Sequence, residues 1–338
     1  MAEFRAIVVG AGGISEAWFP PLKAESVDVA AVVDLNKAAA ERRIAQFGLA
    51  AQASDNLART LRRTQADFLV DLTIPEAHCR VTCAALKAGL HVIGEKPMAA
   101  TMAEARRMVQ ASRDAGKLYM VSQSRRWDFN NDTMAQTVAA GKLGPLTTIN
   151  CDFFKAVHFG GFREAMPSPL ILDMSIHHFD MARMISGKDP VSVYAEEFNP
   201  AGSWYKGDVA ANCIFEMSDG VRFTYRGSWC AEGCHTSWHG HWRVIGQRGT
   251  MLFENDQLPY GQVLVGPTSV ATELTDLEVT RSPVEHTSMH GALREMLRFL
   301  RTGERPQTEC EDNIKSLAMV FAAMESSRKR RRVPVKVW

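Results

Sequence analysis

The sequence carries almost no net charge, because its 39 lysine and arginine residues balance 38 aspartate and glutamate residues to a formal charge of +1. It also lacks an apolar run of bilayer length, and its first residues, "MAEFRAIVVG", show no signal-peptide pattern. Proteins that bind nucleic acid or anionic membranes usually carry a basic excess. We therefore expect a cytoplasmic protein with neither kind of partner.

Cysteine is scarce as well, with seven residues scattered along the chain. Disulfide frameworks use even numbers of cysteines at regular spacings, so we expect reduced thiols, as in a cytoplasmic compartment. The one basic run, "RKRRR" at 328–332, follows an apolar periodic stretch. A nuclear signal or a nucleic-acid patch would have this composition, but cations are also favoured at a helix C-terminus, and we prefer that interpretation.

The length of 338 residues and the 46% hydrophobic content predict two domains with substantial cores. Up to about residue 121, short β-rich runs alternate with helical stretches. This alternation predicts a parallel sheet with helices on both faces. Gly48, Gly89 and Gly116 fit the ends of helices. The predicted strands are "FRAIVVG", "VDVAAVVD", "DFLVDLT", "HVIG" and "LYMVSQ", and the helices between them are "ISEAWFPPLKA", "KAAAERRIAQFG", "EAHCRVTCAALKAG" and "TMAEARRMVQASRDAG".

The rhythm changes after residue 125, where we expect an α+β domain with an open, mostly antiparallel sheet. "MSDGVRF" is typical of a hairpin turn between two of its strands. We therefore divide the chain into domains 1–124 and 125–338. The expected elements of the second domain are a helix over 130–141, a strand over 146–156, a helix over 170–185, strands from about 190 to 280, and helices over 288–302 and 311–328.

A glycine fingerprint, "VVGAGGIS", follows the first predicted strand and opens a helix. Gly10 and Gly12 allow the tight turn and the close approach of a pyrophosphate that a dinucleotide site requires. Ser15, at the third glycine position, is still small. Asp34 ends the second strand, where a carboxylate accepts hydrogen bonds from the adenosine ribose, so we expect NAD rather than NADP. Lys37 weakens that preference, because a nearby cation favours a 2′-phosphate.

The stretch "LILDMSIHHFDMARMI", residues 170–185, is an apolar helix pattern that holds an unusual number of titratable groups. Asp173 and His177 fall on one helical face, and His178 points about a quarter-turn away. Burying such groups costs free energy unless they are paired or used. From this helix alone, a histidine satisfied in the core and a functional histidine remain open. Asp180 most simply pairs with Arg183, one turn further on.

Several motifs together resemble the glucose–fructose oxidoreductase, inositol dehydrogenase and rhizopine-catabolism (Gfo/Idh/MocA) family, over essentially the whole chain. They are the glycine fingerprint, "TIPEAH", "GEKPMA", "RRW" and "DMSIH". The resemblance implies an N-terminal Rossmann domain and a C-terminal domain whose open sheet makes oligomer contacts, in a dimer or tetramer. It also implies oxidation of a secondary alcohol, or reduction of a ketone, on a sugar, cyclitol or related ring.

The resemblance also assigns roles by position. Lys96, Asp173 and His177 match the family's catalytic residues: His177 is the base that removes the alcohol proton, Lys96 stabilises the alkoxide, and Asp173 orients the site. "DMSIH" departs from the family at the residue two before the histidine, where many members have glycine. We also expect the Lys96–Pro97 bond to be a candidate for cis. The expected cofactor-binding residues are Gly10, Gly12, Gly13, Ile14, Asp34, Thr73, Pro75, His78 and Glu95.

Four further residues are candidates for substrate binding beside Lys96. Arg126 and Trp127 follow the fifth predicted strand, where pocket residues are expected, although an arginine bracing the domain junction and a core tryptophan explain them equally well. His158 lies in a glycine-rich loop before the catalytic helix, and glycine there is equally explained by loop chemistry. His178 either lines the pocket or makes an internal contact.

The segment "CAEGCHTSWHGHW", residues 230–242, has the composition of a zinc site. We place it in the strand series, where His235, His239 and His241 would spread over roughly 20 Å, too far for one ion. Hydride transfer to nicotinamide also needs no metal, so we expect none and assign these histidines to a subunit interface or the pocket rim.

Three functions remain open. The first is an NAD-dependent dehydrogenase of a sugar or cyclitol that forms a homo-oligomer. The second is a regulator that senses the dinucleotide without turnover, which has no need of the Lys96, Asp173 and His177 combination. The third is a variant that uses NAD transiently to cleave a glycosidic bond.

Overall fold

The computed structural model describes residues 2–266, 270 and 272–338, so part of the expected strand series, residues 267–269 and 271, lies outside the described residues. The chain forms two compact units. The first combines the chain up to Ser124 with His286–Ile314 and Trp338, and the second comprises Arg125–Glu285 and Lys315–Val337. The cut after Ser124 is where we placed it, but residues 286–314, which we assigned to the second domain, return to the first unit.

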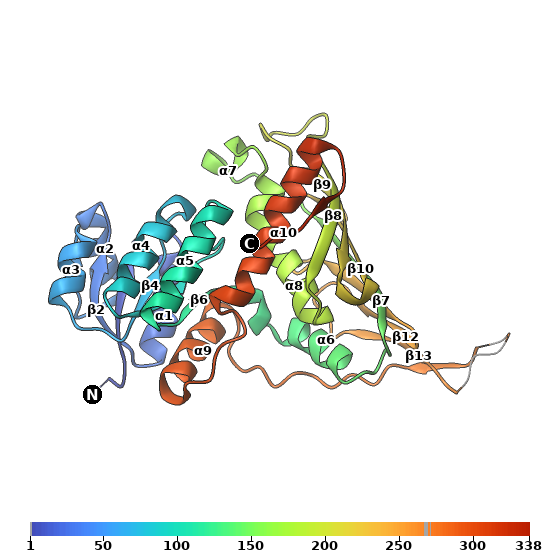
Figure 1. Ribbon diagram of the computed structural model, residues 1–338, viewed down its shortest axis with the longest axis horizontal. Helices are drawn as coiled ribbons and strands as arrows, with labels where there is room; N and C mark the ends of the chain where they lie inside the picture. The colour runs from blue at the N-terminus through green and yellow to red at the C-terminus, as the bar shows by residue number, and fades with distance from the viewer. Residues whose placement is uncertain (1, 267–269, 271) are drawn as a thin grey trace. The chain divides into compact units, whose positions relative to one another are not determined.

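The first unit is built on a parallel sheet, six-stranded within the described residues, in the order β3-β2-β1-β4-β5-β6 (Figure 1). The expected Rossmann architecture is therefore confirmed. Its strands are β1 (Arg5–Val9), β2 (Asp28–Val33), β3 (Gln52–Ser54), β4 (Phe68–Asp71), β5 (His91–Gly94) and β6 (Tyr119–Val121). Its helices are α1 (Ser15–Ala24), α2 (Lys37–Phe47), α3 (Leu57–Arg63), α4 (Pro75–Lys87), α5 (Met102–Ala115) and α9 (Ser288–Thr302).

The central strands of this sheet are apolar along their whole length because helices cover both faces. All four residues of β4 are buried, as are the last four of β1. We missed β3 and α3, because "QAS" at 52–54 has neither apolar alternation nor β-branched residues. Gly48 and Gly116 end α2 and α5 in the left-handed conformation, as expected.

The segment 286–314 adds one helix and one edge contact to the first unit. Helix α9 lies beside α1 (Figure 1). Beyond it, the Val121 amide donates to the Thr308 carbonyl at 3.0 Å, and Met120 forms a bridge with Glu309. The chain thus returns to the free edge of β6, which local sequence patterns do not reveal.

The second unit has a sheet that is nine-stranded among the described residues, in the order β14-β13-β12-β11-β7-β10-β9-β8-β15. The β10–β7 pair is parallel and the other pairs are antiparallel, which confirms the expected open sheet. Its strands are β7 (Leu146–Phe154), β8 (Pro190–Phe198), β9 (Ala210–Met217), β10 (Arg222–Ser228), β11 (His241–Gly246), β12 (Gly249–Phe253), β13 (Tyr260–Leu264), β14 (Leu274–Asp276) and β15 (Val333–Pro334).

Helices cover one face of this sheet. Helix α8 (Ile176–Ser186) packs against α6 (Phe129–Ala139) and β7. The hydroxyl groups of Ser326 and Ser327, in α10 (Cys310–Lys329), accept hydrogen bonds from the amides of Ala195 and Glu197 in β8, at 2.9 Å each. The other face carries half-exposed apolar side chains, such as Tyr194 and Ile214, each 42% exposed. "MSDG" makes the expected turn between β9 and β10.

One local expectation was wrong, and another was correct only in part. Residues 231–240 form a loop between β10 and β11 instead of a strand, because Gly233 and Gly240, both with positive φ angles, interrupt the β pattern. The helix expected over 170–185 begins as a π-helical turn, Leu170–Ser175, and becomes α-helical at Ile176. Such turns are rare and occur frequently at functional sites.

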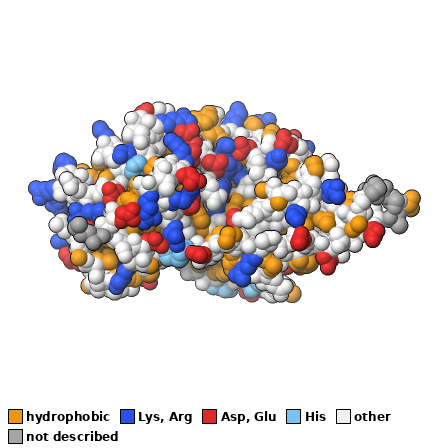
Figure 2. Space-filling view, turned by 90° about the horizontal axis from the view of Figure 1, so that it is seen from below, with side chains coloured by type: hydrophobic (Ala, Val, Ile, Leu, Met, Phe, Trp, Pro, Cys, Tyr) orange, Lys and Arg blue, Asp and Glu red, His pale blue; other side chains and the backbone are white. Residues whose placement is uncertain are grey.

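Basic and acidic side chains are interspersed over the face shown in Figure 2, as a formal charge of +1 suggests. Within the described residues, we find no helix with the length and apolar character needed to span a membrane.

Candidate functional site

The glycine loop between β1 and α1 has two kinds of glycine. Gly10 has a φ angle of +104°, and a Cβ atom there would lie 2.6 Å from the Leu72 carbonyl oxygen, so the fold itself requires glycine. Cβ atoms at Gly12 and Gly13 would meet no atom within 4 Å. Ser15 is fully buried and donates to the Gly12 carbonyl at 2.6 Å. The protein's own packing therefore does not explain Gly12 and Gly13, whereas close approach of a phosphate does.

Asp34 follows β2 and faces the same loop. Its Oδ2 accepts a hydrogen bond from the Ala11 amide at 2.8 Å, and its Oδ1 accepts one from the Asn36 amide, also at 2.8 Å. These bonds fix the carboxylate and leave each oxygen a lone pair for a ribose hydroxyl. The Lys37 Nζ lies 3.2 Å from Glu41 Oε1. Lys37 thus makes an ion pair on its own helix, which reduces the weight we gave it as a partner for a 2′-phosphate.

Gly10, Gly12, Asp34 and Thr73 line one cavity of about 970 Å³. This volume lies at the upper end of the range for small-molecule and cofactor sites. Sequence reasoning missed part of its wall. Leu35 and Ile74 were missed because exposed apolar residues in loops carry no periodic signal. Leu57 of α3 and Arg80 of α4 also line the cavity.

A buried polar network supports Thr73 at the end of β4. The Asp71 Oδ1 accepts a hydrogen bond from the Thr73 hydroxyl at 2.6 Å and lies 3.1 Å from His78 Nδ1. Asp71 and His78 are both buried, and the Nε2 of His78 has no hydrogen-bond partner among the described residues. Pro75 is the first residue of α4, where its missing amide hydrogen costs nothing. Thr73, Pro75 and His78 are thus held together at the start of α4.

Glu95 and Lys96 follow β5, at the same edge of the sheet as Asp71. Glu95 is buried and accepts a hydrogen bond from the Trp18 indole at 2.8 Å. Burial raises the pKa of its carboxyl group, although Trp18 and Lys96 oppose the shift. Lys96 is half-buried, and the Lys96–Pro97 peptide bond is cis, as expected.

These features fit a dinucleotide. At the carboxyl ends of the parallel strands, the glycine loop stands at the start of α1, and the carboxylate of Asp34 is fixed at the end of the neighbouring strand β2. The buried Nε2 of His78 has no hydrogen-bond partner among the described residues. The expected cofactor-binding residues Gly10, Gly12, Asp34 and Thr73 share one cavity.

In the second unit, the π-helical turn presents Asp173. The Asp173 Oδ2 accepts a hydrogen bond from Arg163 Nε at 2.6 Å, with 16% of the aspartate side chain exposed. The Arg163 guanidinium also lies over the rings of Phe159 and Phe162, at 5.1 and 4.9 Å. His177 is half-buried, like Asp173, among buried neighbours. The expected common face of Asp173 and His177 is therefore the more accessible side of this segment.

His178 is fully buried, which supports an internal contact rather than a place in the lining of a substrate pocket. Its Nε2 lies 3.2 Å from Arg125 Nη1, and its ring contacts Phe153 at a centroid distance of 4.7 Å. Burial, with the charge of Arg125, lowers its pKa well below the usual value, so the ring is neutral and accepts the hydrogen bond. Arg125 also donates to the Trp238 carbonyl. His178 thus makes the internal contact that was its alternative role.

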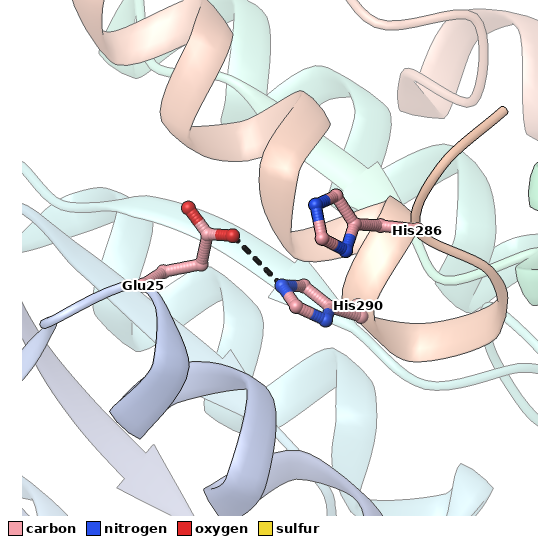
Figure 3. A group of neighbouring side chains, drawn as sticks. All are labelled: Glu25, His286 and His290. Atoms are coloured by element: carbon pink, nitrogen blue, oxygen red, sulfur yellow. Dashed lines mark hydrogen bonds and ion pairs between the residues drawn. The ribbon is translucent and has the colours of Figure 1, made fainter. Parts of the chain in front are cut away.

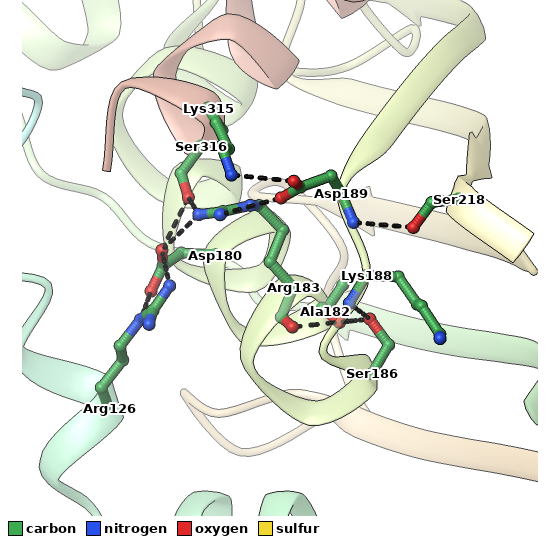
Figure 4. Close-up of polar contacts among 10 residues, drawn as sticks. All are labelled: Arg126, Asp180, Ala182, Arg183, Ser186, Lys188, Asp189, Ser218, Lys315 and Ser316. Atoms are coloured by element: carbon green, nitrogen blue, oxygen red, sulfur yellow. Dashed lines mark hydrogen bonds and ion pairs between the residues drawn. The ribbon is translucent and has the colours of Figure 1, made fainter. Parts of the chain in front are cut away.

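Arg126 is buried and paired with Asp180 (Figure 4). Its Nε and Nη2 donate to the two carboxylate oxygens at 2.7 and 2.8 Å. Asp180 also accepts a hydrogen bond from Ser316 at 2.6 Å and lies 3.8 Å from Arg183, its expected partner. This arrangement supports a bracing role for Arg126 rather than substrate binding. Trp127 is buried too, in agreement with a core tryptophan.

The other histidines that the sequence singled out do not share one site among the described residues. His158 is 64% exposed and stacks on Trp204 at a ring distance of 3.7 Å, on the surface rather than in a pocket. His235 is exposed. His239 Nδ1 lies 2.9 Å from the side-chain nitrogen Nδ2 of Asn131. His241, in β11, places its Nε2 3.2 Å from Asn255 Oδ1.

Comparisons with known proteins agree with this architecture. The chain is 27% identical to the uncharacterized protein y4oX of Sinorhizobium fredii, over 99% of this chain and 96% of that one. It is also 27% identical to a D-apiose dehydrogenase of Paraburkholderia graminis, over 99% and 90%. The crystal structure of an oxidoreductase from Agrobacterium radiobacter, in complex with NAD+, L-tartaric acid and magnesium, superposes with a TM-score of 0.85 at 21% identity, covering 98% of each chain.

Two family matches cover most of the chain. Residues 4–123 match the oxidoreductase family with an NAD-binding Rossmann fold, and residues 131–252 match the Gfo/Idh/MocA C-terminal domain. With the glycine loop, the fixed Asp34 and the open nine-stranded sheet in place, the chain belongs to the Gfo/Idh/MocA family of NAD-binding oxidoreductases.

Proposed function

We propose that this protein is an NAD-dependent dehydrogenase that oxidises a secondary alcohol, or reduces the corresponding ketone, on a sugar, cyclitol or related ring. The observation that carries the proposal is the cavity in which the glycine loop and the fixed carboxylate of Asp34 meet. The likeness to a D-apiose dehydrogenase supports a sugar-related small-molecule substrate.

The preference for NAD rests on Asp34. Its carboxylate accepts hydrogen bonds from adenosine ribose hydroxyls, whereas a 2′-phosphate beside it is repelled. Arg43, the cation next to the glycine loop, donates to the Ala11 carbonyl at 3.3 Å and forms an ion pair with Glu16. Its charge is thus offset by a carboxylate, as that of Lys37 is by Glu41.

We assign the proton chemistry to Lys96 and His177, on their match to the family's motifs. NAD held by the glycine loop and Asp34 would supply the hydride acceptor. As the hydride leaves the carbinol carbon, His177 takes the hydroxyl proton, and the ammonium group of Lys96 stabilises the developing negative charge on the oxygen. Asp173 orients this site, and Arg163 holds the Asp173 carboxylate through the hydrogen bond of 2.6 Å.

A screen of sugars and cyclitols for NADH formation tests the activity, and two variants test the assignment. Lys96→Ala and His177→Ala should each lower turnover by several orders of magnitude while dinucleotide affinity, measured by fluorescence titration, stays nearly unchanged. His158→Ala is the matched control, because this exposed histidine lies on the surface. If either variant keeps near-wild-type turnover, the assigned role is wrong. Dinucleotide binding without turnover of any compound would favour a sensing regulator.

We also propose that the open face of the second sheet joins copies of the chain. Tyr194 and Ile214 expose apolar surface beside the Arg226–Asp152 ion pair, a mixture typical of protein interfaces. Sedimentation analysis should show a dimer or tetramer, and Ile214→Glu should shift it toward monomer. A monomeric wild-type protein would refute this proposal.

A further inference from the structure

Two histidines and a glutamate meet in the first unit, at the end of α1 away from the glycine loop (Figure 3). Glu25 caps the C-terminus of α1, His286 precedes α9, and His290 lies in the first turn of α9. One ligand atom of each residue lies within 4.8 Å of those of the other two. Residues distant in the chain thus place two imidazoles and a carboxylate around one point.

The three side chains already contact one another. The His290 Nε2 lies 2.7 Å from Glu25 Oε1, and the two histidine rings have centroids 4.2 Å apart, inclined by 35°. Between the histidines, Ser288 adopts a φ angle of 58°, in the left-handed region that residues other than glycine seldom occupy. That conformation turns the chain so that His286, which lies outside the helix, faces His290.

The donor set selects a class of ion. Two imidazole nitrogens and a carboxylate oxygen are ligands of zinc in proteins, with a water in the fourth tetrahedral position, whereas magnesium and calcium prefer oxygen ligands. Bond lengths of about 2.0–2.2 Å place tetrahedral ligand atoms about 3.3 Å apart. Side-chain rotation has to separate His290 Nε2 from Glu25 Oε1, now 2.7 Å apart, and to bring the more distant ligand atoms closer together. The partial exposure of Glu25 and His290, at 18% and 23%, leaves room for rotation and for the water.

The charges and helix ends around Glu25, His286 and His290 have opposing effects on the affinity for a cation. The C-terminal carbonyls of α1 favour a cation beside Glu25, while the amides at the start of α9 disfavour one. Arg294 Nε lies 3.9 Å from Glu25 Oε1 and competes with a metal for the carboxylate. The Arg294 side chain is 47% exposed, so its guanidinium can turn into solvent. These effects predict moderate affinity and identify Arg294 as a residue that weakens it.

We propose that Glu25, His286 and His290 form a binding site for zinc or a similar borderline divalent cation, which ties α9 to α1. We expected no metal because hydride transfer needs none. That reasoning concerns the dinucleotide end of the first unit, whereas this site lies at the opposite end of α1. The bound ion would stabilise the fold by linking residues 25 and 290, and it takes no part in the proposed dehydrogenation.

Zinc titration of tag-free, chelator-treated protein in competition with a chromophoric chelator tests the proposal. Wild type should bind one equivalent, and Glu25→Gln, His286→Ala and His290→Ala should each lose at least about tenfold in affinity, the lower bound for losing a partner of a metal ligand. At the same zinc concentration, the melting temperature of wild type should rise more than that of any of the three variants. His235→Ala, at an exposed histidine beside the exposed Cys234, is the matched control and should behave as wild type.

Arg294→Ala should increase the affinity for zinc, because it removes the cation that competes for Glu25. A misfolded variant would lose affinity rather than gain it. Cobalt should give the visible bands of a nitrogen and oxygen site without thiolate charge transfer. Equal zinc affinity in wild type and the three ligand variants, or its loss in His235→Ala, would overturn the proposal. So would the absence of zinc binding by wild type. None of these readouts depends on dehydrogenase activity.

Discussion

Replacing Arg126 with methionine tests the buried pair with Asp180 and decides between the two roles that the sequence left open for this arginine. Arg126 and Asp180 are 6% and 2% exposed and share two short hydrogen bonds. Removing one partner of such a pair typically costs about 3–5 kcal/mol, because the other charge stays buried. Ser316 still donates to Asp180 at 2.6 Å, so we expect a loss near the lower end, about 3 kcal/mol.

Urea unfolding followed by tryptophan fluorescence measures the loss in the free energy of unfolding. For a unit of this size, the same loss should lower the melting temperature by about 6–12 °C. Arg113→Met is the matched control: Arg113 also forms two hydrogen bonds with a carboxylate, that of Glu311, but is 44% exposed. Exposed pairs contribute about 1 kcal/mol or less, so this variant should remain close to wild type.

The double variant Arg126→Met, Asp180→Leu separates the cost of an unpaired charge from the loss of a favourable contact. Removing both charges should recover most of the stability lost in the single variant. Burial tends to raise the pKa of Asp180, but the charge and hydrogen bonds of Arg126, together with Arg183 and Ser316, lower it. A carboxyl group with a lowered pKa stabilises the fold at neutral pH and loses this effect as pH falls through the folded value, so the difference between wild type and Arg126→Met should shrink below about pH 4.

A loss below about 1 kcal/mol in Arg126→Met would refute this reasoning. So would a double variant that is less stable than the single one. Near-wild-type stability combined with a raised KM for the substrate would instead establish Arg126 as a substrate-binding residue.

Three further predictions concern other parts of the chain. Asp34→Ala should lower the ratio of kcat/KM with NAD to kcat/KM with NADP. A wild-type preference for NADP would contradict our assignment. Gly10→Ala should abolish dinucleotide binding, measured by fluorescence titration, because its Cβ would lie 2.6 Å from the Leu72 carbonyl oxygen; retained affinity would show that the loop can move. Burial raises the pKa of Glu197 to about 7, so ionisation above the unfolded value near 4.5 costs stability as pH rises. Glu197→Gln should therefore gain stability over wild type between pH 5 and pH 8 in urea unfolding, and parallel pH profiles would contradict this.

The local patterns of the first unit were sufficient for most of its fold. Strands β1, β2 and β4 are continuous apolar runs, and Gly48 and Gly116 mark helix ends, so each signal lies within a few residues. Strand β3 escaped prediction because its three residues are defined by pairing with β2 rather than by their own composition. The loop over 231–240 was misassigned for a related reason, since isolated apolar residues there resembled a strand.

In the candidate site, too, local sequence patterns predicted some residues, and the roles of others depend on tertiary contacts. The glycine loop and Asp34 were predictable, because a strand, a tight turn and a helix follow one another along the chain. The role of His178 was not, because its neutral state depends on burial and on Arg125, which is 53 residues away. Lys96, Asp173 and His177 are candidates because of their family motifs, and periodicity by itself placed only Asp173 and His177 on one face.

The sequence by itself determined most strands and helices of the first unit, the dinucleotide fingerprint and the family, because these depend on spacings of a few residues that any fold of this chain must satisfy. Only the tertiary structure decided which charged groups are paired. Asp180 accepts its hydrogen bond from Arg126, 54 residues away, although Arg183 lies one turn along the same helix. Glu25 contacts His290, which is 265 residues away. The free energy of a buried charge depends on every group that packing brings within a few ångströms, and sequence separation does not report that distance.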